Sequence, residues 1–216
     1  MPFAQSLILL LFLKPVHEKL AVDRDLLLSK DLSELLLAKE AFLGFIGNDK
    51  RRIYMQFDSI WKDHEQYNLY HIKGHSTVKG NRCDFKGMLI IESIETDQNI
   101  PLGLDERKPS SNIQASGKIK GHYLFSENPK QKHVGLFSGN FWCTWLLTKD
   151  ASLSSNELQS HGDNYRDHQY QGIWRPYGES DSRVCNWGTY RIPNCGDLDI
   201  GAAEFSPNPK YHAQGW

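Results

Sequence analysis

"ASGKIKGHYLFSE" (residues 115–127) carries the pattern that decides the fold. In this pattern a glycine has an apolar side chain two residues before it and another two residues after it. Within it, Gly121 stands between Ile119 and Tyr123, with polar residues in the intervening positions. Glycine inside a strand marks a bend, a bulge or a close backbone approach, because it has no Cβ. The stretch therefore predicts a strand in a strongly curved sheet.

The pattern recurs along the chain. It is found as IKGHS at 72–76, FKGML at 85–89, FSGNF at 137–141 and YQGIW at 170–174, with a looser echo in WGTY at 187–190. Glycines placed alike in successive strands are what a sheet needs in order to coil and close. The glycine spacings of 13, 34, 18 and 33 residues are irregular, which argues against a propeller or solenoid. The sequence predicts a mainly β protein, an antiparallel meander closed into a barrel of about eight to ten strands, with a β-sandwich as the alternative.

Three parts of the chain are expected. Residues 1–40 comprise a leader-like apolar segment and a helical arm, residues 41–205 the β-barrel domain, and residues 206–216 a C-terminal tail. Leucines at helical spacing in 17–40 predict one helix or two short ones, either a docking arm or a plug for a barrel end. Two polar stretches, 96–116 and 149–164, are expected to be long loops.

The apolar run from Leu7 to Leu13 is too short to span a bilayer and resembles the central region of a signal peptide. No Lys or Arg precedes it. The run predicts a periplasmic or secreted protein, with a cytoplasmic one as the alternative. With 25 basic and 26 acidic residues and no long basic run, the chain shows no nucleic-acid footprint.

The four cysteines allow three full pairings. None forms a C-x-x-C motif, so a zinc ribbon or a thioredoxin-type site is unsupported. For an exported chain we expect a disulfide between Cys83 and Cys185, with Cys185–Cys195 as the local alternative. Cys143, in "NFWCTWLL", is expected to be a buried thiol.

Motifs for metals, cofactors and catalysis are missing. His71 and His75 are four residues apart, which in a strand places them about 13 Å apart, too far to share a metal. Asp197, Asp199 and Glu204 lack the offsets of a calcium loop, so hydrogen-bonded turns are expected around them. No nucleophile elbow, phosphate loop or dinucleotide fingerprint is present. We expect no metal and no cofactor, and a non-catalytic protein is favoured, although a site assembled from several strands leaves no local signature.

Aromatic residues are the stronger functional lead. Seven of them would fill or line the interior of a barrel: Tyr123, Phe141, Trp142, Trp145, Tyr170, Trp174 and Trp187. Packed together they would form a core. Around a cavity, all but Trp142 are the candidate contacts for a small apolar or sugar-like ligand.

Several runs resemble a family of uncharacterised, exported bacterial proteins. They are "NRCDFKG", "GHYLFSE", "HVGLFSGNF", "QYQGIW" and, most specifically, "CNWGTYRIP" followed by "GDLDIGAAEF". The family has no assigned activity, so the resemblance implies no catalytic residue. The general layout is also similar to lipocalin-like and avidin-like barrels, although the lipocalin G-x-W signature is absent.

Three functions follow as hypotheses. The first is non-catalytic binding of a small ligand inside the barrel. The second is a structural or interaction module of the cell envelope with a filled core. The third is a hydrolase or isomerase whose residues converge from several strands. Oligomeric state cannot be read from the sequence.

Overall fold

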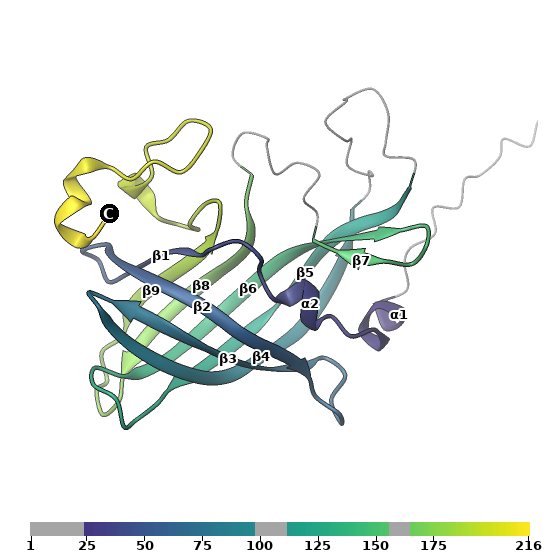
Figure 1. Cartoon of the computed structure of the whole chain (residues 1–216), viewed down its shortest axis with the longest axis horizontal. Coiled ribbons are helices and arrows are strands. Elements are labelled where there is room, and N and C mark those ends of the chain that lie inside the picture. The colour runs from purple at the N-terminus through teal and green to yellow at the C-terminus, as the bar shows by residue number, and fades with distance from the viewer. Residues whose placement is uncertain (1–23, 98–111, 156–164) are drawn as a thin grey trace, which may run out of the picture.

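A computed structural model describes residues 24–97, 112–155 and 165–216, and it is a closed antiparallel β-barrel (Figure 1). The barrel strands are β1 (Leu43–Ile46), β2 (Arg51–Lys62), β3 (Leu69–Val78), β4 (Asn81–Thr96), β5 (Ile113–Glu127), β6 (Gly135–Thr148), β8 (Asp167–Pro176) and β9 (Arg183–Thr189). A two-residue strand, β7 (Leu153–Ser154), pairs with β6 outside the ring. The predicted leader, and residues 98–111 and 156–164 of the two predicted loops, lie outside the described residues.

Each barrel strand pairs with the next one along the chain, and β9 returns to pair with β1. The predicted meander, closed by eight strands, is confirmed. The sandwich alternative is wrong, because the β5–β6 and β1–β9 ladders leave one continuous ring instead of two packed sheets.

Glycines create the room that the interior rings occupy. Gly87 lies directly opposite Phe125, and Gly121 directly opposite Phe141, on the neighbouring strand. A Cβ on Gly87 would lie 2.6 Å from the Phe125 ring, and one on Gly121 would lie 2.9 Å from the Phe141 ring. Aromatic rings laid over strand glycines stabilise curved sheets. The recurring glycine pattern is therefore a packing pattern as well as a bending one.

The middle of the barrel is filled by aromatic rings. Tyr170 stacks on Trp187 with ring centroids 5.1 Å apart, and on its other side stacks with Phe141 at 5.7 Å. Tyr123 meets both Tyr170 and Trp187 edge-on at 5.5 and 5.1 Å. Such contacts add to the burial energy of the rings. This part of the interior is a packed core.

A long N-terminal helical arm is not supported by the described residues, whereas two short helices that plug a barrel end, one of the alternatives left open by the leucine spacing, are found. The described part of this region holds only two short helices, α1 (Arg24–Ser29) and α2 (Ser33–Leu36), at one end of the barrel (Figure 1). Their buried leucines, which are Leu27, Leu28, Leu32, Leu35 and Leu36, belong to the same apolar cluster as the barrel interior. The amphipathic spacing serves to place leucines inside the barrel instead of along an arm.

The segment that contains α1 and α2 is the plug of the barrel, and hydrogen bonds hold it to the rim of the barrel. The Lys62 ammonium donates to the carbonyls of Leu28 and Lys30 at 2.6 and 2.8 Å. The backbone N–H of Leu32 donates to the Tyr70 hydroxyl at 3.2 Å. Burial raises the pKa of Tyr70 to about 12. The hydroxyl therefore stays protonated and available at neutral pH.

The chain after β9 folds back over the outside of the barrel. It contains two 3-10 helices, η2 (Gly196–Leu198) and η3 (Pro209–Gln214). Leu198 and Cys195 pack with Phe45, an outward residue of β1, in a separate apolar cluster. The Asp199 carboxylate accepts from the backbone N–H groups of Gly201 and Ser206 at 3.0 and 3.1 Å, the hydrogen-bonded turn expected there.

The predicted disulfides are wrong, and all four cysteines are free and buried. Cys83 is on β4 and Cys185 on β9, four strands apart in either direction around the eight-stranded ring. They therefore lie on opposite sides of the barrel, beyond the Cα separation that a disulfide allows. The alternative pairing fails because Cys185 belongs to the interior cluster and Cys195 to the outer one.

Candidate binding pocket

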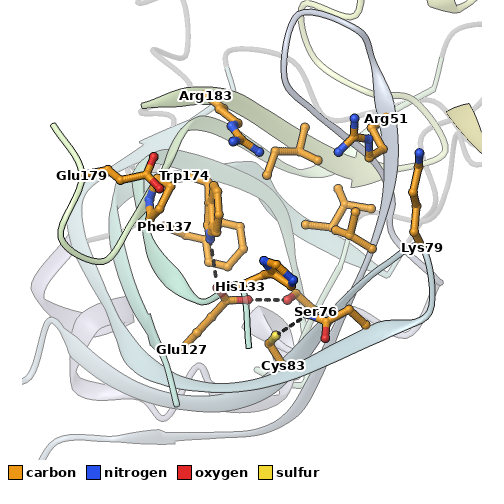
Figure 2. Close-up of a pocket in the computed structure, with 15 residues that line it drawn as sticks. Arg51, Ser76, Lys79, Cys83, Glu127, His133, Phe137, Trp174, Glu179 and Arg183 are labelled. Atoms are coloured by element: carbon orange, nitrogen blue, oxygen red, sulfur yellow. Dashed lines mark hydrogen bonds between the residues drawn. The ribbon is translucent and has the colours of Figure 1, made fainter. Parts of the chain in front are cut away.

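A pocket of about 480 Å³ occupies the end of the barrel opposite the plug (Figure 2). Its walls are the final residues of β1, β3, β5 and β8 and the first residues of β2, β4, β6 and β9. The plug instead contacts Lys62 and Tyr70, at the other ends of β2 and β3. The barrel thus has one closed end and one open end.

Glu127 forms the floor of the pocket. Its side chain is only 3% exposed. One carboxylate oxygen accepts from the Ser76 hydroxyl at 2.5 Å, and the other accepts from the Trp174 indole N–H at 2.9 Å (Figure 2). The second oxygen also accepts from the Gly135 backbone N–H at 2.8 Å. These contacts tie together β3, β5, β6 and β8. The carboxyl group therefore fixes the shape of the pocket floor.

Two opposing influences act on the ionisation of Glu127. Burial disfavours the charged carboxylate, and the three donors favour it. Burial is the larger influence, so the pKa of Glu127 is raised above its ordinary value. Cys83 lines the same pocket. Burial raises the pKa of its thiol, and the charge of Glu127 raises this pKa further.

Three cationic side chains lie along one side of the mouth of the pocket (Figure 2). Arg51 begins β2, and Arg183 begins β9. Lys79 is in the two-residue turn between β3 and β4, where it and Gly80 both have positive φ, as a type I′ hairpin requires. Closure of the barrel brings these three elements to the same rim.

Apolar side chains make up much of the wall beneath the cations. Ile46, Ile53 and Phe137 line it together with Trp174. The Arg183 guanidinium lies 5.4 Å from the centre of the Trp174 ring, a cation–π contact that links mouth to wall. His133 and Glu179 also line the pocket. An apolar wall with a few polar groups is typical of small-molecule sites.

The six aromatic candidates are distributed unevenly. Trp174 lines the pocket. Tyr123, Phe141, Tyr170 and Trp187 lie in the packed middle, and Trp145 is fully buried with its indole N–H donating to the Glu95 carbonyl at 3.2 Å. Trp142 is only partly buried, beneath the Lys118 ammonium. That these rings contact a ligand stays a prediction.

Sequence reasoning missed most of the polar residues of the pocket. One signal for Glu127 was available: Tyr123, Phe125 and Glu127 alternate along β5, so the carboxylate had to face the same interior as the two rings. The cations carried no such signal. Arg51, Lys79 and Arg183 are far apart in the sequence and are brought together only by the order of strands around the ring.

Within residues 24–97, 112–155 and 165–216, no group of three or more His, Cys, Asp or Glu side chains is placed to hold a metal ion. None of the helices in this part of the chain is both long and apolar enough to cross a membrane.

Comparison with models of known families, with curated proteins and with solved structures found no match.

Proposed function

We propose that this protein binds a small ligand, without chemical conversion, in the pocket at the open end of its barrel. The observation that carries the proposal is the pocket itself, about 480 Å³ in volume with apolar walls and a few polar groups. Ligand sites in proteins have volumes of roughly 300–1,000 Å³ and this kind of lining. The packed rings of the middle set the depth of the site, since they leave the ligand only the space above Glu127.

The pocket also bears on the two other hypotheses. Glu127, His133 and Glu179 all line it, and a buried carboxyl with a raised pKa is a feature of catalytic sites. The oxygens of Glu127 are, however, already engaged by three donors from the pocket wall. We therefore assign this carboxyl a role in shaping the site. A purely structural module needs no such pocket.

Export to the periplasm or the medium is a separate proposal. It depends on the apolar run at residues 7–13, which lies outside the described residues. The free cysteines remove the disulfide argument for an oxidising compartment.

Binding of a neutral apolar dye tests the proposed function. N-phenyl-1-naphthylamine fluoresces more strongly in apolar surroundings, so a titration gives its dissociation constant. We expect saturable binding to the wild-type chain. The variant Val78→Trp, which adds bulk to the pocket wall, is expected to bind at least about tenfold more weakly, because the ring fills the site.

The matched control is Val184→Trp, which adds the same ring to an outward, 43% exposed position of β9 near the same end of the barrel. It is expected to bind the dye as the wild type does. Unsaturable binding to the wild type, or equal binding by the two tryptophan variants, contradicts the proposal.

A further inference from the structure

We infer that the ligand is an apolar molecule bearing one anionic group, which the mouth of the pocket binds through Arg51, Lys79 and Arg183. This inference rests on the proposed function and adds the chemical class of the ligand. Two independent observations carry it, the uncompensated charge at the mouth and an unpaired donor on Arg51.

The charge at the mouth is not neutralised by the protein. Within the described parts of the chain, Arg51 has an ion pair, to Asp49 at 2.8 Å, whereas Lys79 and Arg183 have none. Glu179 is the one exposed carboxylate among the described residues that line the pocket. Lys79 and Arg183 therefore carry charges that no ion pair within the described residues compensates, and these charges attract anions.

Arg51 also presents a donor with no acceptor. Its Nε–H is buried and makes no hydrogen bond within the described residues, while Nη2 of the same guanidinium contacts Asp49. Buried donors are almost always paired, because an unpaired one loses its hydrogen bond to water without replacement. A small rotation of the Arg51 side chain would bring this donor to an oxygen of a carboxylate, sulfonate or phosphate bound in the pocket.

The interior determines which way such a ligand faces. Below the mouth the wall is formed by Ile53, Phe137 and the Trp174 ring, and the floor by Glu127. The donors at the floor already serve the Glu127 carboxyl, which itself repels an anion when ionised. The apolar body therefore enters first, and the anionic group stays among the cations at the mouth.

A matched pair of dyes separates charge from apolar burial. 8-Anilinonaphthalene-1-sulfonate has the ring system of N-phenyl-1-naphthylamine plus one sulfonate. We expect the sulfonate dye to bind the wild-type chain at least about tenfold more tightly at low salt. The advantage should shrink as sodium chloride is added, because salt screens charges at an exposed mouth.

Charge-removing variants locate the effect. Arg51→Gln, Lys79→Gln and Arg183→Gln should each weaken binding of the sulfonate dye several-fold, and by a larger factor than they weaken binding of the neutral dye. The control is Arg175→Gln, because Arg175 is next to Trp174 on β8 but is exposed on the outer face. It should leave both dissociation constants unchanged.

The outcomes distinguish the two proposals. If the wild type binds both dyes with equal affinity and Val78→Trp weakens the binding of both, the anionic inference is overturned and the proposed function still stands. An advantage for the sulfonate dye that Arg175→Gln reduces as much as the three mouth variants do also overturns the inference. If neither dye binds saturably, the proposed function fails, and the inference fails with it.

Discussion

Glu127 is the residue on which the pocket depends, since its carboxyl group accepts three hydrogen bonds from three different strands. A buried acceptor of this kind is more costly to remove than to replace. Removal leaves the donors without partners, whereas an isosteric replacement keeps them paired.

Replacing Glu127 by alanine should therefore lower the free energy of unfolding by about 3 kcal/mol, because the Ser76 hydroxyl, the Gly135 N–H and the Trp174 indole N–H lose their acceptor. Glu127→Gln should cost less than about 1 kcal/mol, since its amide oxygen accepts and its amide nitrogen donates to the Ser76 hydroxyl. Urea denaturation measures both. Equal losses for the two variants would show that the hydrogen bonds are not what Glu127 contributes.

The raised pKa of Glu127 predicts a pH dependence of stability. The folded state holds this proton more tightly than the unfolded state does. The contribution of the group to stability is therefore fully present below its unfolded pKa, and it is lost as the pH rises through the higher folded pKa. Glu127→Gln does not titrate at this position.

We expect the wild type to be most stable relative to Glu127→Gln at low pH, and to lose that advantage as the pH rises above the ordinary glutamate pKa of about 4 and through the higher folded pKa. Urea denaturation of both proteins across this range gives the difference directly. A difference that grows with pH would mean that the three donors outweigh burial and lower the pKa.

Among the elements, the paired strands owe their curvature to glycines opposite aromatic rings. A Cβ on Gly121 would lie 2.0 Å from the Ile90 carbonyl oxygen and 2.9 Å from the Phe141 ring. The first of these atoms is backbone and the second is part of a packed ring. The Ile90 carbonyl cannot move without disturbing the ladder between β4 and β5, and the Phe141 ring of β6 cannot move without disturbing its stack with Tyr170.

Gly121→Ala should accordingly lower the free energy of unfolding by about 2–3 kcal/mol through overpacking. The neighbouring control His122→Ala, at an outward and exposed position of β5, should change it by less than about 1 kcal/mol. Thermal or urea denaturation distinguishes them. A neutral Gly121→Ala would refute the packing role given to the glycine pattern.

The two short helices act as a plug because their leucines complete the barrel core. Leu36 is fully buried, whereas Leu26, on the same segment, is 55% exposed. Leu36→Ala should cost about 2–4 kcal/mol of stability, and Leu26→Ala less than about 0.5 kcal/mol. Equal small effects in denaturation experiments would mean that the plug does not contribute to the core.

For the whole molecule, features set by residues close together in the sequence could be predicted, and features set by residues far apart in the sequence could not. The closed meander was predictable because Gly74, Gly87 and the later glycines recur within local strand patterns. The positions of Cys83 and Cys185 around the ring were not, since separation along the chain does not give the angle between two strands. The plug followed the same rule: leucine spacing indicated one or two helices but did not decide between a docking arm and a plug for a barrel end.

The pocket was beyond local patterns for a related reason. It is formed where alternate ends of eight strands meet, so its residues lie at one end of the barrel but are spread along the sequence from Ile46 to Arg183. Only Glu127 had a local signal, the alternation that places it on the same inward face of β5 as Tyr123 and Phe125. The convergence of Arg51, Lys79 and Arg183 required the closed ring. Closure thus produces both the packed middle and the open end.

The central claim is that the barrel is filled through its middle and receives a ligand only at the end opposite the plug. Two indole groups report on the two regions: Trp174 lines the pocket, and Trp145 is buried outside it. The most direct measurement is an NMR titration of the indole N–H signals of ¹⁵N-labelled protein with N-phenyl-1-naphthylamine. The account predicts that the Trp174 signal shifts in proportion to occupancy while the Trp145 signal stays in place. A Trp174 signal that does not move at saturating dye, or a larger shift at Trp145, would contradict it.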